Sequence, residues 1–170
     1  MKGLWKIVDF FRATRRRMRF GEFSRAPLRI LRLEVRGRTA ECEWLARPPD
    51  VWDRALPRHV GDSNHSVQAL QDALKLRELL LAELPEIHSA VFRVFRQAPR
   101  EPPELIITGI VTRDKVRKGI SSLVMQAKLS GLRFSLDDGR LQALRLEERE
   151  TRWDNFPLLR NPWVRQLVEH

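Results

Sequence analysis

The stretch from Ser66 to Leu136 constrains the fold most, because the spacing of its apolar residues changes repeatedly along the chain. Apolar residues at three- and four-residue steps indicate helices, whereas short apolar or alternating runs indicate strands. By this criterion the stretch forms a helix, two strands, a second helix and a further strand, over residues 67–84, 90–95, 105–111, 116–129 and 132–136. This unit is predicted to supply most of the core.

Further strand signals flank this unit on both sides. Residues 28–35 and 39–46 alternate between apolar and polar side chains around a glycine turn, which predicts a β-hairpin. The adjacent apolar residues Ile30 and Leu31 break the alternation and predict a bulge. Residues 141–146, after a second glycine turn, are predicted to form another strand.

Cys42 lies on the apolar face of the predicted hairpin, opposite Glu41 and Glu43. A cysteine in that position is expected to be a small core residue rather than a nucleophile. Because it is the only cysteine, an intramolecular disulfide is impossible and a zinc site built on cysteines is excluded.

The predicted strand pairs have short connections and can be antiparallel. We therefore expect an α+β fold with one antiparallel or mixed sheet of about six strands and two main helices on one face. At 170 residues the chain fits a single domain. It divides into a basic amphipathic helix (1–20), an α+β core (27–147) and a tail (148–170), in which Asn161-Pro162 predicts a short C-terminal helix.

Residues 47–65 are predicted to form a long, proline-rich loop. Pro57 and Gly61 argue against a helix in this segment. The helix that follows is expected to begin near Ser63 or Ser66, because either serine can cap its first turn.

The same loop carries one candidate set of metal ligands, His59, Asp62 and His65, each three residues from the next. Two histidines and a carboxylate can hold a divalent metal and leave positions open for a substrate. A metal-dependent hydrolase that uses residues 50–65 is therefore one hypothesis. The preferred alternative is that these residues form turns and cap the next helix. We accordingly expect no enzyme, no metal and no cofactor, and we interpret the acidic run 147–150 as solvated.

The net charge of +10 is concentrated at the N-terminus. Residues 1–38 hold twelve Lys and Arg against three Asp and Glu, whereas residues 39–170 hold twenty against nineteen. Residues 3–19 have the spacing of a basic amphipathic helix. Its buried stripe is predicted to consist of Leu4, Ile7, Val8, Phe11 and Met18.

Aromatic residues accompany the arginine cluster in this helix, namely Trp5, Phe10 and Phe11. The combination is typical of a membrane interface, where apolar burial and attraction to anionic lipid act together. The residues predicted to contact an anionic surface are Trp5, Lys6, Arg12, Arg15, Arg16, Arg17 and Arg19.

The sequence also bears on the compartment. No apolar run approaches the roughly 20 residues that cross a bilayer. No small-residue cleavage site follows the N-terminal apolar residues, so we expect no signal peptide. The expected location is the cytoplasm, peripheral to the membrane if the basic helix binds lipid.

The pattern of residues 66–136 is similar to that of a BON domain, whose topology also runs helix, strand, strand, helix, strand. The run 105–112, with Gly109 inside it, resembles the second strand of that family. The sequence departs from the family in having a single copy and a proline-rich loop at residues 97–103, where a tight turn is usual. The resemblance implies attachment to phospholipid or to protein surfaces.

Three hypotheses concern the basic helix. The first is a binding module that contacts an anionic surface such as membrane lipid. The second is a nucleic-acid-binding protein that uses the same arginines, which the absence of tyrosine and of a recognised motif makes less favoured. The third is a structural or protein-interaction protein whose helix docks on its own sheet or on a second chain, with solvated arginines. Burial of Leu4, Val8 and Phe11 favours the third hypothesis, and their exposure favours the first.

Overall fold

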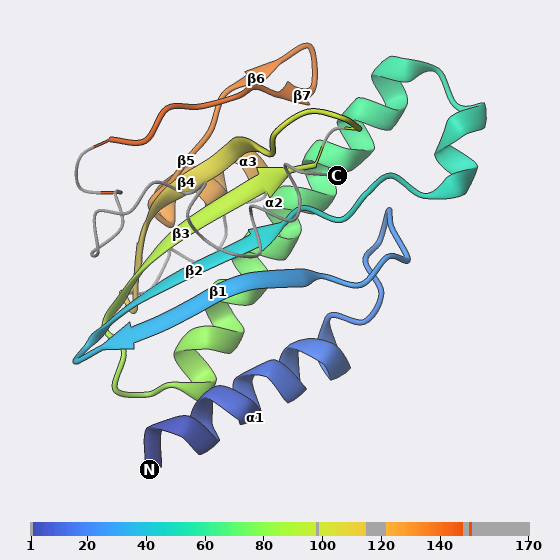
Figure 1. Cartoon of the computed structure of the whole chain (residues 1–170). Coiled ribbons are helices and arrows are strands. Elements are labelled where there is room, and N and C mark those ends of the chain that lie inside the picture. The colour runs from blue at the N-terminus through green and yellow to red at the C-terminus, as the bar shows by residue number, and fades with distance from the viewer. Residues whose placement is uncertain (1, 98, 115–121, 148–149, 151–170) are drawn as a thin grey trace.

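The computed structural model describes residues 2–97, 99–114, 122–147 and 150 (Figure 1). The helices in these ranges are α1 (Lys2–Arg17), α2 (Arg58–Glu83) and α3 (Leu123–Leu129), with a short 3-10 turn, η1 (Val51–Ala55). The strands are β1 (Arg29–Arg36), β2 (Thr39–Leu45), β3 (Ser89–Arg96), β4 (Glu104–Thr112), β5 (Leu132–Arg133), β6 (Leu136–Asp137) and β7 (Arg140–Leu141).

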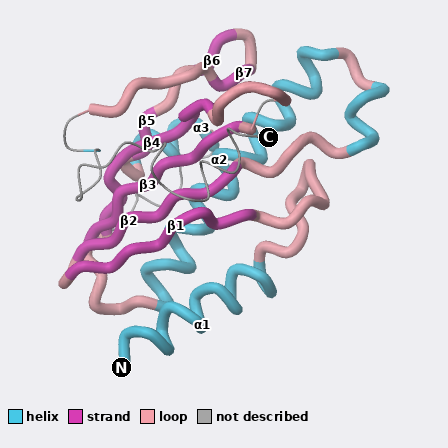
Figure 2. The backbone as a smooth tube through the Cα atoms, viewed as in Figure 1, coloured by secondary structure: helices cyan, strands magenta, loops and turns pink. Residues whose placement is uncertain are grey.

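Strands β1 to β5 form one mixed sheet in the order β1-β2-β3-β4-β5, and β6 and β7 form a separate pair. β1 and β2, β3 and β4, and β4 and β5 are antiparallel. β2 and β3 are parallel, so a crossover must connect them, and α2 lies in that connection (Figure 2). The α+β class and the first hairpin are confirmed. The bulge is also confirmed, because the register shifts between Ile30 and Arg32.

One core cluster joins all three helices to the same face of the sheet, and Figure 1 shows α2 running along that face. Trp44 on β2 packs edge-to-face on Phe92 of β3, with ring centroids 5.0 Å apart. Cys42 is fully buried in the same core cluster. Burial raises the pKa of the Cys42 thiol, which keeps it protonated and confirms it as a core residue.

Helix α2 begins at Arg58, earlier than the predicted start, so the prediction of a loop up to residue 65 is wrong. Pro57 immediately precedes the helix, where its missing N–H costs nothing because the first amides of a helix have no partner within it. Its carbonyl accepts hydrogen bonds from Val60 and Gly61. Gly61 costs about 1 kcal/mol relative to alanine, which the packing of a 26-residue helix outweighs.

The C-terminal strands are shorter than predicted. Residues 132–136 yield β5 and the first residue of β6, and residues 141–146 do not continue as a strand beyond Leu141 of β7. Leu144 and Leu146 instead pack on the second face of the sheet, against a cluster formed by Leu31, Leu45, Phe95 and Leu105. Of the predicted helix 116–129, residues 123–129 are helical, and residues 116–121 lie outside the described residues. The predicted C-terminal helix lies outside the described residues.

Candidate functional site

Helix α1 docks on the core through a face that differs in part from the predicted one. Phe10 is fully buried, and Met18 is buried as predicted. Leu4 is 67% exposed, so its assignment to the buried stripe is wrong, while Val8 and Phe11 are half-buried. Apolar residues occupy so many positions of α1 that their spacing allows several stripes. The structure buries the ring of Phe10 fully and that of the adjacent Phe11 only in part, so the buried stripe is centred on Phe10.

Arg47, just after β2, fixes the C-terminal end of α1 and is itself buried. Its guanidinium donates to the carbonyl oxygens of Met18 and Ala26, at 2.6 and 3.0 Å. Carbonyls at the end of a helix lack partners within it, so the contact satisfies the carbonyl of Met18, which directly follows α1. Its Nε lies 2.8 Å from Oδ2 of Asp72 on α2, and Gln68 donates to the other oxygen of Asp72.

An ion pair ties the N-terminal half of α1 to the segment after α2. Lys6 contacts Glu86, and the hydrogen bond from Lys6 lowers the pKa of the Glu86 carboxyl. Lys6, one of the predicted surface-contact residues, is thus engaged within the chain. Because both ends of α1 are held, the helix presents one fixed outer face.

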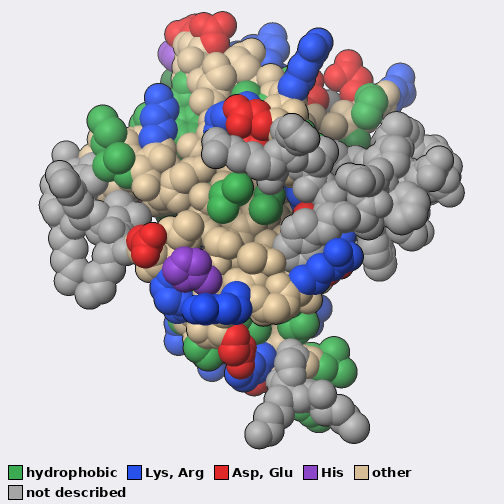
Figure 3. All heavy atoms as spheres, turned by 90° about the vertical axis from the view of Figure 1, so that its left-hand side faces the viewer, with side chains coloured by type: hydrophobic (Ala, Val, Ile, Leu, Met, Phe, Trp, Pro, Cys, Tyr) green, Lys and Arg blue, Asp and Glu red, His purple; other side chains and the backbone are tan. Residues whose placement is uncertain are grey.

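This outer face combines apolar and basic side chains. Trp5 is 64% exposed, next to the exposed Leu4. The exposed basic residues on the helix and just after it are Arg12, Arg15, Arg16, Arg17 and Arg19. Figure 3, which views the molecule from the side where α1 begins, shows Lys and Arg side chains on both the upper and the lower part of that face, with exposed hydrophobic side chains among them. Six of the seven predicted contact residues therefore reach the surface, and Lys6 is half-buried.

The arginines of this face are only partly engaged by other side chains. Arg12 lies 3.7 Å from Asp9 in an exposed pair. Arg19 lies over the ring of Phe20, 5.1 Å from its centroid. Within the described ranges, no carboxylate pairs with the three consecutive arginines 15–17. Most of the positive charge on this face is therefore available to a partner.

His59, Asp62 and His65 lie on the first turns of α2 and not in a loop. A step of six residues turns a helix through about 240°, so the two histidines point to different sides. His59 is exposed, whereas His65 is half-buried. In the part of the chain that the structure describes, no three His, Cys, Asp or Glu side chains are placed to hold a metal ion. This geometry gives the hydrolase hypothesis no support.

His65 is expected to make stability depend on pH. Burial, followed by the positive charge of Arg96, lowers its pKa from 6.5 to about 4. The unfolded chain therefore binds a proton between these values that the folded chain does not, so stability falls as the pH drops from 6.5 to 4. With allowance for partial exposure, the loss is on the order of 2 kcal/mol.

Urea unfolding of the native chain and of His65→Gln, each at pH 7 and at pH 4, measures this effect. The quantity compared is the loss of stability between the two pH values. The variant should lose less stability on acidification. His59→Gln, at an exposed position of the same helix, should behave like the native chain. Identical pH profiles for all three proteins would contradict the assignment.

The second face of the sheet carries a row of polar side chains that the sequence pattern did not indicate. One residue from each strand contributes, because each is the register partner of the next: Arg32, Glu43, Arg93, Thr108 and Arg133. The three central members are fully buried. Arg93 stands within the predicted strand 90–95, whose other residues are apolar.

The charges in this row are paired with one another. Arg93 lies 3.0 Å from Glu41 and 3.0 Å from Glu43, and its Nε donates to the carbonyl of Glu150 at 2.7 Å. Burial opposes ionisation of Glu150, but hydrogen bonds from Arg133 and from the Glu147 amide outweigh it and lower its pKa. Glu150 is buried, so the interpretation of the acidic run 147–150 as solvated is wrong at that position. We interpret the row as structural.

Comparisons of the chain with protein-family models, with curated proteins and with solved structures give no match. The helix, strand, strand, helix, strand order predicted for residues 66–136 corresponds to α2, β3, β4, α3 and β5. Among the described helices, none combines the length and the hydropathy that a bilayer-spanning segment requires.

Proposed function

We propose that the chain is a non-enzymatic binding module that contacts an anionic membrane surface, as a peripheral protein, through the outer face of α1. The main support is that a docked helix exposes Leu4 and Trp5 in its first half and, in its second half, the arginines 15–17, which have no carboxylate partner in the described chain. Docking of α1 on the core explains why Phe10 and Met18 are buried, but it does not explain why Trp5 is exposed.

The two halves of α1 supply different parts of this contact. An exposed tryptophan suits the headgroup level of a bilayer, where its ring is half in apolar and half in polar surroundings. Each Lys or Arg near an anionic leaflet contributes about 1 kcal/mol. The helix has 16 residues and is therefore about 24 Å long, so it can lie along the surface with both halves in contact.

Other partners are possible in principle for the same arginines. Nucleic-acid phosphates bind arginine with a strong dependence on salt, and an acidic protein surface offers carboxylates. The exposed Leu4 beside Trp5 favours lipid, because moving a leucine side chain from water to the boundary between headgroups and acyl chains lowers the free energy. Binding to nucleic acid or to protein remains an alternative that the experiment below separates.

Sedimentation with vesicles of an anionic phospholipid tests the proposal. The triple variant Arg15→Gln, Arg16→Gln, Arg17→Gln should bind anionic vesicles at least about tenfold more weakly, because three surface charges are lost. The matched control is Arg58→Gln, Arg100→Gln, Arg145→Gln, which removes the same charge from exposed positions outside α1 and outside residues 20–25 and 50–55. The control should bind like the native chain, and neutral vesicles should bind both proteins weakly.

Equal sedimentation with neutral and anionic vesicles would contradict the proposal, as would equal losses in the two triple variants. Retention of nucleic acid by the native chain, without any binding to vesicles, would favour the nucleic-acid alternative. Absence of both would favour a protein partner or a structural role.

A further inference from the structure

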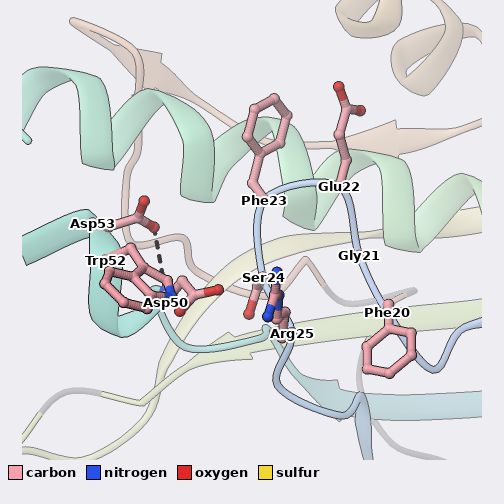
Figure 4. A pocket seen from close by; sticks show the side chains of 9 residues that line it. All are labelled: Phe20, Gly21, Glu22, Phe23, Ser24, Arg25, Asp50, Trp52 and Asp53. Atoms are coloured by element: carbon pink, nitrogen blue, oxygen red, sulfur yellow. Dashed lines mark hydrogen bonds between the residues drawn. The ribbon is translucent and has the colours of Figure 1, made fainter.

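A pocket of about 660 Å³ opens beside the end of α1, lined by residues 20–25 together with Asp50, Trp52 and Asp53 (Figure 4). This volume falls in the range of about 300–1,000 Å³ that is usual for small-molecule sites. One wall follows α1 directly, and the other is formed by η1 and the residue before it. The pocket therefore adjoins the surface proposed to contact the membrane.

The wall formed by residues 20–25 is held in place by hydrogen bonds. The amide of Gly21 donates to the carbonyl of Ser24 at 2.9 Å, and the Ser24 hydroxyl donates to the carbonyl of Pro48 at 2.8 Å. The amide of Phe23 donates to Gln68 Oε1 at 2.7 Å. Gly21 lies so close to Gln68 that a Cβ atom would come within 2.4 Å of its Oε1. The pocket is thus preformed, which lowers the cost of binding.

The η1 end of the pocket has the chemistry of a cation site. Trp52 is 77% exposed, and η1 contains no buried residue. Asp50 and Asp53 line the pocket beside it, and Asp53 accepts a hydrogen bond from the Asp50 amide at 3.2 Å. A third carboxylate, Glu22, is held by Gln71 at 2.7 Å. An aromatic face next to carboxylates attracts an ammonium group and repels an anion.

The wall formed by residues 20–25 supplies positive charge. Phe20 is 63% exposed and carries the Arg19 guanidinium over its ring. Arg25 lines the pocket. In the view of Figure 4, Trp52 and Phe20 lie at opposite ends of the labelled residues, with Arg25 between them. A ligand that carries an ammonium group and a phosphate a few bonds apart complements both ends.

We propose that this pocket binds the headgroup of an amine-bearing phospholipid, with the ammonium against Trp52, Asp50 and Asp53 and the phosphate beside Arg25 and Arg19. This inference rests on the proposed function in one respect. The membrane contact of α1 identifies a phospholipid as the source of the headgroup. In this arrangement α1 supplies general attraction to negative lipid, and the pocket adds selectivity for the amine.

Soluble headgroups test the pocket without a membrane. Glycerophosphoethanolamine is titrated into the full chain while the indole N–H resonance of Trp52, assigned with Trp52→Phe, is followed by NMR. Glycerophosphoglycerol has the phosphate without the amine, and ethanolamine has the amine without the phosphate. The resonance should shift saturably with glycerophosphoethanolamine, and each fragment should bind more weakly.

Two variants locate the interaction, with ligand-detected NMR giving the dissociation constants. Asp50→Asn, which keeps a residue able to cap η1, and Trp52→Ala should each weaken binding of glycerophosphoethanolamine by about three- to tenfold. Trp5→Ala is the matched control, since it removes an exposed tryptophan away from the pocket. It should leave headgroup binding unchanged and weaken sedimentation with anionic vesicles.

The outcomes separate the two proposals. Vesicle binding without any shift of the Trp52 resonance, or equal binding of glycerophosphoglycerol, overturns the pocket assignment and leaves the proposed function intact. A saturable Trp52 shift without vesicle binding supports the pocket chemistry and overturns the proposed function. Unchanged headgroup affinity in Asp50→Asn and Trp52→Ala overturns the placement of the ammonium.

Discussion

Replacing Arg93 by alanine is expected to lower the free energy of unfolding by about 3–5 kcal/mol, because the change leaves buried carboxylates without their positively charged partner. The Arg93 guanidinium is fully buried and pairs with both Glu41 and Glu43. These carboxylates keep their contacts with Arg32, but one guanidinium then faces two buried negative charges. The Glu150 carbonyl also loses its donor. Urea unfolding at pH 7 measures the change.

The matched control is Arg36→Ala, at the end of β1. Arg36 is exposed and pairs with Glu34 at 2.8 Å. Pairs at the surface contribute at most about 1 kcal/mol, because water screens them and compensates for their loss. A loss in Arg93→Ala no larger than in Arg36→Ala would show that the buried row of the sheet does not depend on Arg93.

Arg47→Ala is expected to destabilise the chain by about 3 kcal/mol or more, and to loosen the end of α1 in particular. The change leaves the Asp72 carboxylate without its guanidinium, although burial already disfavours the charged form and raises its pKa. It also removes the donor to the carbonyls of Met18 and Ala26, and an unpaired buried acceptor costs about 1–3 kcal/mol.

Two measurements check this prediction. Urea unfolding gives the global loss, and limited trypsin digestion reports local opening, because Arg17 and Arg19 stand where α1 ends. Arg12→Ala is the control, since Arg12 is exposed, forms only an exposed pair with Asp9 and leaves the trypsin sites at the end of α1 intact. It should change the stability by less than about 1 kcal/mol. Equal effects of the two substitutions would contradict the anchoring role of Arg47.

Local patterns predict the order of the elements well in this chain. The alternation of residues 39–46 and the apolar run 105–111 yield β2 and β4 within one or two residues. These signals are local, because a strand that buries one face or both faces shows this in the pattern of its own apolar residues. The bulge at Ile30 is equally readable, since two adjacent apolar residues cannot share one face of a regular strand.

Local sequence patterns do not predict features that depend on residues far apart in the sequence. The parallel pairing of β2 with β3 follows from the path of α2, and no local period encodes it. Which face of α1 is buried depends on the cavity that the core offers to Phe10. The early start of α2 has a local signal after all, because Pro57 suits the position that precedes a helix.

The candidate site was predictable in part. The arginines and Trp5 follow from the basic N-terminal helix, whereas the engagement of Lys6 by Glu86 joins residues far apart in sequence. The buried row has one signal in the sequence, an arginine at position 93 inside an otherwise apolar run. Such a residue needs a buried acid, and Glu41 and Glu43 supply it only once the sheet has formed.

The parallel pairing of β2 with β3 also sets the order in which the sheet can assemble. Partners in this pair are fifty residues apart, as are Thr39 and Ser89, whereas β1 and β2 are joined by a tight turn. Hairpins form within about 1–10 μs, but a long loop must lose more entropy before its ends meet, and contacts between distant residues slow folding. We therefore expect the two hairpins to form early. We expect their joining at the centre of the sheet, where Trp44 meets Phe92, to be the slowest step of assembly.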